Sequence, residues 1–239
     1  MMARLNYFLS LLLLCFTFSC KEATETGGDT MIHTKADVVG NDFRLFELMR
    51  PEETGVVFSN NTKQTFDFNF IDFGYFINGA GVAVLDYDND GLTDIFFVSN
   101  QEDNRLFRNL GNWKFEDVSQ SAGLLGFDGF HTGVNVIDIN ADGYPDLYVA
   151  RSNADERPEG AFLRSNLLFV NQGDGTFRES ATKYGLASDR PTTQSVFFDY
   201  DLDGDLDCYL VNTPMDYVNS HKIRVQNVDG VMKRIRTPK

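Results

Sequence analysis

The sequence predicts an all-β protein, and three observations support this prediction. Short runs rich in Val, Phe and Tyr recur along the 239 residues, acidic nine-residue loops separate pairs of these runs, and the whole pattern repeats at long intervals. Runs of this composition are typical of strands. Four strands in about 50 to 60 residues form the unit of a β-propeller blade, so we expect a partial β-propeller of four-stranded blades.

The composition fits a folded protein with a strongly acidic surface. Hydrophobic residues make up 42% of the chain, which includes 22 Phe, and the formal net charge is -14. This charge argues against nucleic acid as a partner, because phosphate binding needs clustered Lys and Arg. Twelve of the 35 acidic residues lie in the three loops. Three divalent cations there would leave a net charge of about -8, so metal sites explain the acidity better than a solubilising coat.

The first 20 residues resemble a secretory signal. An apolar run at residues 7–18 follows Arg4, and it is too short to span a bilayer, which takes about 20 residues. Ser19 before Cys20 is similar to a bacterial lipoprotein signal, which implies Cys20 as the lipidated first residue of the mature protein; ordinary cleavage with a soluble product is the alternative. This resemblance predicts a protein of the bacterial cell envelope, attached to the outer membrane through a lipid anchor only.

Residues 21–42 are polar and are expected to form a flexible tether, and residues 43–239 are expected to form the incomplete propeller region. Residues 43–49 have room only for a short helix or an edge strand that stops at Pro51. Residues 66–71 alternate apolar and polar side chains, which predicts a half-buried strand.

Three loops follow the pattern D-x-[DN]-x-D-G-x-x-D, at residues 86–94, 138–146 and 199–207. Oxygen-bearing side chains at positions 1, 3, 5 and 9, with Gly at position 6 for a sharp turn, suit a hard cation such as calcium. An EF-hand would carry a Glu at position 12, but Phe97, Val149 and Leu210 stand there and strand-like residues follow. The ligand set is therefore expected to close at position 9.

We expect about one Ca²⁺ in each loop, held by four side chains and the position-7 carbonyl. Magnesium is a poorer fit because it retains its waters, and acidic turns without metal are the alternative, since Asp, Asn and Gly favour turns. Repulsion between the carboxylates of one loop argues for the metal. The predicted ligands are Asp86, Asp88, Asp90, Leu92, Asp94, Asp138, Asn140, Asp142, Tyr144, Asp146, Asp199, Asp201, Asp203, Asp205 and Asp207.

A second motif, Asn-x-Leu-Phe-x-Asn, follows the first loop at residues 104–109 and the second at residues 166–171. The two copies and the segments after them share one offset of 62 residues. Turn sequences after each copy predict a hairpin. Each unit thus supplies strand, acidic loop, strand, connection, strand, turn and strand.

The loops and their flanks resemble the FG-GAP or VCBS repeat, the calcium-bearing blade of integrin α-subunit propellers and of many bacterial surface proteins. Residues 78–91, with the Asn-x-Leu-Phe-x-Asn segments, are similar to bacterial lipoproteins that carry such repeats ahead of an ASPIC/UnbV domain. The resemblance implies a propeller with calcium at the rim of its blades, a binding role and no catalytic residues. Three recognisable blades and a partial leading one do not close a ring of 4 to 8 blades, so we expect an amino-terminal fragment.

The last part of the chain is basic and lacks a third copy of the second motif. Residues 228–230 predict a hairpin turn between alternating strands, with the charges on a solvated strand face. Cys208 follows the third loop and is expected to be a small buried hydrophobe, with a reactive thiol as the minor alternative.

An enzyme is not expected, because motifs of metalloproteases, serine hydrolases and phosphate-binding loops are missing from the sequence. His131 is interpreted as packed or capping. The leading hypothesis is a calcium-binding, envelope-anchored module that binds a protein or glycan. The alternative is a scaffold for a further carboxy-terminal domain, and a hydrolase is less favoured.

Overall fold

The computed structural model describes residues 46–66, 68–71, 73–152, 165–214, 225–228 and 231–234. In these ranges the helical structure is the single turn α2 (Pro51–Thr54), and all other regular elements are strands, as predicted. The strands are β1 (Val82–Leu85), β2 (Asp94–Phe97), β3 (Arg105–Asn109), β4 (Phe115–Asp117), β5 (His131–Ile137), β6 (Asp146–Arg151), β7 (Leu167–Asn171), β8 (Phe177–Glu179), β9 (Thr192–Phe198), β10 (Asp207–Asn212), β11 (Val225–Val228) and β12 (Val231–Arg234).

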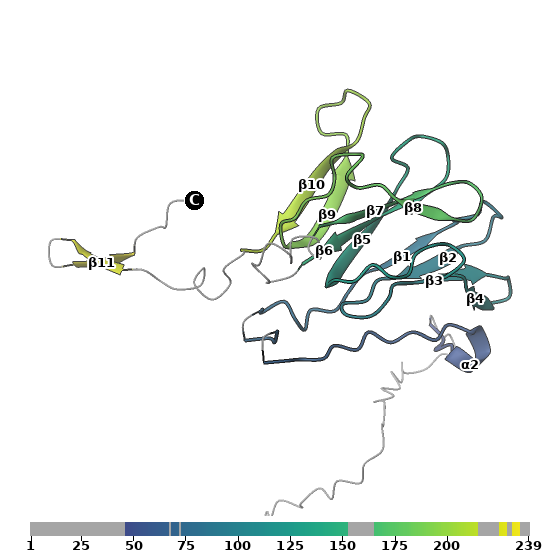
Figure 1. The fold of residues 1–239 in the computed structure, drawn as a ribbon, viewed down its shortest axis with the longest axis horizontal. Coiled ribbons are helices and arrows are strands. Elements are labelled where there is room, and N and C mark those ends of the chain that lie inside the picture. Colours follow the sequence, from purple (N-terminus) through teal and green to yellow (C-terminus); the bar gives the residue numbers. More distant parts are fainter. Residues whose placement is uncertain are drawn as a thin grey trace, which may run out of the picture. The chain divides into compact units, whose positions relative to one another are not determined.

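Two four-stranded antiparallel sheets repeat one topology (Figure 1). The strand order is β1-β2-β3-β4 in the first sheet and β5-β6-β7-β8 in the second. In both sheets the acidic loop joins the first two strands and a short turn joins the last two. This is the up-and-down order of a propeller blade. The register agrees as well, because Ile95 pairs with Phe107 in the first sheet as Leu147 pairs with Phe169 in the second.

A third sheet holds β9 and β10, joined by the third acidic loop, and a separate hairpin holds β11 and β12. In that hairpin Val228 pairs with Val231, which confirms the predicted turn position. The described strands therefore make two complete blade-like sheets and a third of two strands, without closing a ring.

The first strands of the three sheets lie next to one another, β1 beside β5 and β5 beside β9. Glycine permits this close approach. A Cβ atom on Gly81 would lie 3.0 Å from the Val134 nitrogen, and one on Gly133 would lie 3.2 Å from the Thr193 carbonyl oxygen. Gln194 stands where the first two sheets have these glycines, and its side chain lies against Gly133.

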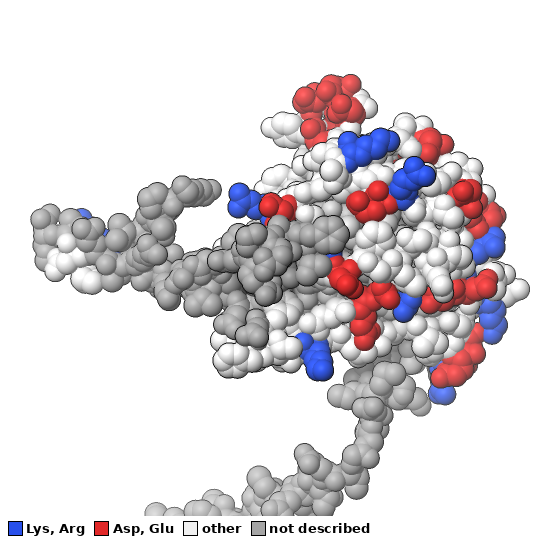
Figure 2. All heavy atoms as spheres, in the orientation of Figure 1, with Lys and Arg blue, Asp and Glu red and all other residues white. Residues whose placement is uncertain are grey.

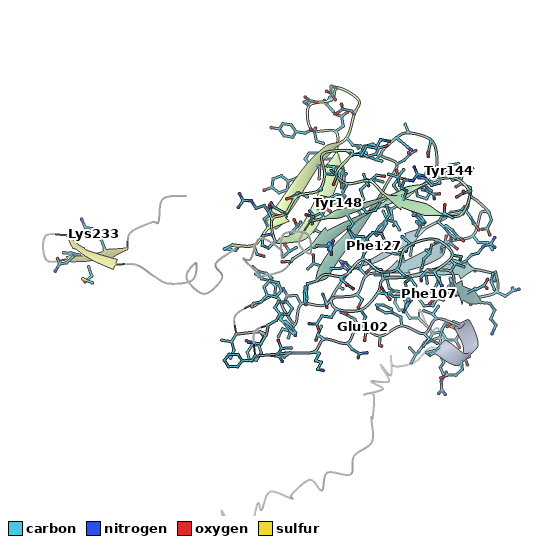
Figure 3. The ribbon with its side chains drawn as sticks, viewed as in Figure 1. Glu102, Phe107, Phe127, Tyr144, Tyr148 and Lys233 are labelled. Carbon is cyan, nitrogen blue, oxygen red and sulfur yellow. The ribbon has the colours of Figure 1, made fainter. Side chains whose placement is uncertain are left out.

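The core lies between successive sheets, and β6 shows how it is divided. Every residue of β6 is buried. Leu147 and Val149 pack with the first sheet, and the alternating neighbour Tyr148 packs against Phe197 of the third, with ring centroids 5.1 Å apart. Figure 3 shows Tyr148 and Phe127 among the side chains around the second sheet. Because both faces of the second sheet are covered at its centre, the two middle strands β6 and β7 are buried on both sides.

One prediction for the segment before the first sheet is wrong. Residues 46–49, the described part of residues 43–49, form no regular element, which is within the predicted limit of a short helix or an edge strand. The single turn α2 begins at Pro51, because proline suits the first position of a helix. Residues 66 and 68–71 form bends and turns in place of a strand. Local side-chain bonds fix these turns: the Thr65 hydroxyl accepts the Phe68 N–H at 3.0 Å and Asn69 accepts the Ile71 N–H at 2.9 Å.

The predicted signal, the lipidation site Cys20 and the tether lie outside the described residues. Within the described residues, no helix is long and apolar enough to span a membrane.

Candidate metal centres

The three acidic loops share one backbone conformation. In each loop the residue at position 4 and the glycine at position 6 have positive φ, a geometry that glycine adopts without strain and other residues adopt at a cost. The pairs are Asn89 (56°) with Gly91 (87°), Ala141 (56°) with Gly143 (85°), and Leu202 (64°) with Gly204 (97°). Asn, which tolerates this region best after Gly, occupies position 4 only in the first loop.

The carboxylate at position 1 closes the turn in each loop. Asp86 accepts hydrogen bonds from the N–H groups of Asp90 at 3.0 Å and Gly91 at 2.9 Å. Asp138 accepts the corresponding bonds at 3.1 and 2.9 Å, and Asp199 accepts that of Gly204 at 3.1 Å. These bonds hold the position-1 side chain over the inside of the loop.

Two of the loops gather three carboxylates. The side chains of Asp86, Asp88 and Asp94 each offer an oxygen within 4.8 Å of the others, and Asp199, Asp201 and Asp207 do the same. In both clusters one oxygen is buried without a hydrogen-bond partner in the structure, Oδ1 of Asp88 and Oδ1 of Asp199. A buried carboxylate oxygen without a donor is costly unless a cation satisfies it, so the donor set fits a divalent ion. Figure 2 shows acidic side chains gathered over the loop between β9 and β10.

The second loop carries one charge fewer. Asn140 stands at position 3, and its amide donates a hydrogen bond to Asp142 at 2.7 Å. An amide oxygen is still a calcium ligand of the usual kind.

Position 5 lies outside the two carboxylate clusters. In each loop its carboxylate accepts the N–H of the position-7 residue: Leu92 to Asp90 at 2.9 Å, Tyr144 to Asp142 at 2.9 Å, and Asp205 to Asp203 at 3.2 Å. Of the four predicted side-chain ligands, the structure thus brings positions 1, 3 and 9 together, and position 5 braces the turn.

The carboxylate at position 9 ties the loop to the rest of its sheet. Asp94 is fully buried, and it accepts the Tyr87 N–H at 3.0 Å and the Asn109 N–H at 2.7 Å. Asp146 repeats both bonds with Ile139 at 2.9 Å and Asn171 at 2.7 Å. One side chain therefore joins the acidic loop to the end of the third strand.

Burial raises the pKa of Asp94 and of Asp146 above the usual value, although two N–H bonds to each carboxylate act in the opposite direction. The nearby carboxylates of each loop also raise these pKa values. A cation in the loop would reverse this balance by favouring the ionised form. In the third loop Asp207 is exposed and accepts the Tyr200 N–H at 2.8 Å.

Arg108 is a site residue that the sequence analysis missed. Its Nε lies 2.7 Å from Oδ2 of Asp88 in an ion pair, and its Nη2 donates to Oδ2 of Asp90 at 3.0 Å. These carboxylates raise the pKa of the Arg108 guanidinium above its usual value. Val170 occupies the same place in the second repeat, and this difference between the repeats was the available signal.

The structure also explains the Asn-x-Leu-Phe-x-Asn motif. The first Asn accepts an N–H at or just beyond the end of the second strand, Asn104 from Ser99 at 3.0 Å and Asn166 from Arg151 at 2.8 Å. The last Asn donates its backbone N–H to the position-9 carboxylate. The motif therefore ties both ends of the third strand to the second.

The first two loops are also joined across the sheets. Nδ2 of Asn171 donates to the Tyr87 carbonyl at 2.8 Å, and Nδ2 of Asn89 donates to the Gly143 carbonyl at 3.3 Å. The loops are thus part of the contact between neighbouring sheets.

Two other predicted features are found as follows. His131 is buried, as expected, and its Nδ1 lies 3.0 Å from the Ser99 carbonyl oxygen. Burial and the nearby Arg151 lower the pKa of His131 to about 3. Cys208 is half-buried, less than predicted, and burial raises its pKa, which disfavours a reactive thiolate.

An open pocket of about 640 Å³ lies away from the acidic loops. It combines amide, hydroxyl and charged side chains with two aromatic rings. Its lining residues are Asn61, Thr62, Lys63, Thr65, Phe68, Gln101, Glu102, Gly129 and Phe130.

Comparison with known proteins relates the acidic loops and their flanking strands to a known repeat. Residues 86–149 match the model of the FG-GAP-like repeat. Cartilage acidic protein 1 of Xenopus tropicalis is 30% identical over 138 residues, and those of Mus musculus and Homo sapiens are 30% and 28% identical over 135 and 138 residues. The matches cover 56–57% of this chain and 20% of each relative, so the chain spans about a fifth of their length. Residues 86–149 are an FG-GAP-like repeat, and the two four-stranded sheets to which they contribute strands have the form of β-propeller blades.

Proposed function

We propose that this chain is a calcium-stabilised binding module of the β-propeller type, with one Ca²⁺ in each acidic loop. The observation that carries the proposal is the recurrence of three carboxylates with oxygens within 4.8 Å of one another, at positions 1, 3 and 9 of two separate loops. Such groups repel one another without a cation, and carboxylate oxygens on a flexible loop suit calcium. The second loop has the same backbone with an amide at position 3.

Thermal unfolding tests the metal. Each ion present at about 100 times its dissociation constant adds roughly 2.7 kcal/mol to the folded state, so one occupied loop raises the melting temperature by about 5 to 10 °C for a chain of this size, and three occupied loops raise it further. We expect this rise with calcium relative to chelator, and a smaller one with magnesium. An unchanged melting temperature in calcium would refute the metal proposal.

The proposed ion is expected to stabilise the sheets and not to contact the partner directly. Each position-9 carboxylate of the first two loops also holds the third strand of its sheet, and the first loop contacts the second sheet through Asn171. A cation bound there would stiffen both the sheet and the contact between sheets. Partner binding is then expected on other surfaces of the propeller.

For the partner we propose a protein or glycan, and the open pocket is the candidate contact. Amide and hydroxyl groups beside an aromatic ring suit sugar hydroxyls and ring faces. Binding of the full chain to a glycan array, compared with Lys63→Ala and Glu102→Ala variants, tests this. A scaffold role without a partner of its own predicts that the chain captures neither glycans nor proteins, and such an outcome would favour that alternative.

We also keep attachment to the bacterial envelope through a lipid on Cys20 as a proposal. A Cys20→Ala variant expressed in a bacterial host should leave the membrane fraction and lose incorporation of labelled fatty acid. Labelling that persists in the variant would refute this site.

A further inference from the structure

Within the described residues, the first acidic loop is the one whose carboxylates form ion pairs with a basic side chain, that of Arg108. We propose that Arg108 competes with calcium for the first loop, so that this loop binds the metal more weakly than its carboxylates alone would. The inference rests on the proposed calcium function and adds a residue that sets the affinity of one site.

The guanidinium engages two of the predicted ligands at once. It contacts Asp88 at 2.7 Å and Asp90 at 3.0 Å, the carboxylates at positions 3 and 5. The side chains of Asp88 and Asp90 are 16% and 28% exposed and that of Arg108 is 37% exposed, so the group is partly shielded from water. Calcium in the loop would either displace the guanidinium or share Asp88 with it. Both cost free energy, and the second loop, where Val170 stands in place of Arg108, does not incur that cost.

The second repeat supplies the internal comparison. Val170 takes the place of Arg108 on the third strand, where it is 6% exposed and packs in the core with Tyr148. The two strands have the same register in their sheets, so the arginine is a change of side chain within the same backbone.

The net charge of each loop predicts the order of the calcium affinities of the three loops. The first loop has four carboxylates, the second has three and the third has five. Arg108 reduces the first loop to the net charge of the second. We therefore expect the third loop to bind calcium most tightly, and the first to bind no more tightly than the second despite its extra carboxylate.

Removing the positive charge should tighten the first site. Removing one positive charge next to a divalent ion, in a loop that water still reaches, changes affinity by about tenfold. The Arg108→Gln variant keeps a hydrogen-bonding side chain and loses the charge. Arg108→Lys keeps the charge and is the matched control. Arg105→Gln removes a nearby arginine that lies 3.9 Å from Asp117, away from the loop, and controls for overall charge.

The experiment is a titration of the full chain with CaCl₂ alone, followed by amide NMR. Each loop has its own reporter, because the N–H of its position-6 glycine bonds the position-1 carboxylate: Gly91 to Asp86, Gly143 to Asp138 and Gly204 to Asp199. In Arg108→Gln, the Gly91 midpoint should fall about tenfold while the Gly143 and Gly204 midpoints stay within twofold. Both control variants should behave as the parent chain does.

The outcomes separate the two proposals. An unchanged or higher Gly91 midpoint in Arg108→Gln would overturn the competition by Arg108, even though calcium binds. A fall of the same size in Arg105→Gln would assign the effect to overall charge and would also overturn it. If none of the three glycines responds to calcium in the parent chain, the calcium function itself fails.

Discussion

Replacing Asp94 by Ala should destabilise the protein even without calcium, because this carboxylate joins the first loop to the third strand. The side chain is 0% exposed and accepts N–H groups from Tyr87 and Asn109. Each N–H left buried without an acceptor costs about 1 to 3 kcal/mol. Removing the carboxylate also relieves the burial that raises its pKa, which offsets part of this cost. A net loss of roughly 3 kcal/mol is expected.

Asp90→Ala, in the same loop, is the matched control. Asp90 is exposed, accepts one N–H from Leu92 and pairs with Arg108 near the surface, so its loss should cost less than about 1 kcal/mol. The assay is urea unfolding of both variants and the parent chain in excess chelator. Equal destabilisation by Asp94→Ala and Asp90→Ala in chelator would refute the structural role of position 9.

Two further predictions concern groups outside the metal clusters. Because the pKa of His131 in the folded protein is about 3, below the usual 6.5, the folded state resists protonation and loses stability as the pH falls. Between pH 7 and 5 the loss should be about 2 kcal/mol, and His131→Leu should flatten it; an unchanged pH dependence of urea unfolding in that variant would contradict this. Asn171→Ala should cost about 1 to 3 kcal/mol more than Asn109→Ala, because Asn171 alone of the two bonds the Tyr87 carbonyl of the neighbouring sheet. Equal melting temperatures for these two Asn variants would refute that cross-sheet bond.

The repeated part of the fold could be predicted from the sequence because two periodic signals coincide. The strand-like runs on both sides of each acidic loop gave the first two strands of each sheet, and the motif ending in Asn109 and Asn171 gave the third. The prediction of a strand at residues 66–71 is wrong. Alternation of apolar and polar residues indicates only that a half-buried strand is possible, because a strand also needs a neighbouring strand to pair with. Here the Thr65 and Asn69 side chains accept backbone N–H groups and stabilise turns instead.

The site could be predicted only in part. The residue spacing within a loop indicates which side chains can bind a cation, but it does not show which basic side chains from other strands pair with the same carboxylates. The clusters at positions 1, 3 and 9 follow from the loop pattern. The arginine at position 108 lies 20 residues after Asp88, and its approach to the loop depends on how β3 pairs with β2. The double role of Asp94 was equally hidden, since the N–H of Asn109 reaches it only through that pairing.

The most direct test of the calcium account is a count of ions per chain. Native mass spectrometry of the full chain, after exchange into a solution with free calcium in the micromolar range, should give three bound Ca²⁺. Asp86→Asn and Asp199→Asn should each reduce the count to two, and the double variant should bind one. A count of zero in the parent chain, or three ions retained in both single variants, would contradict the account.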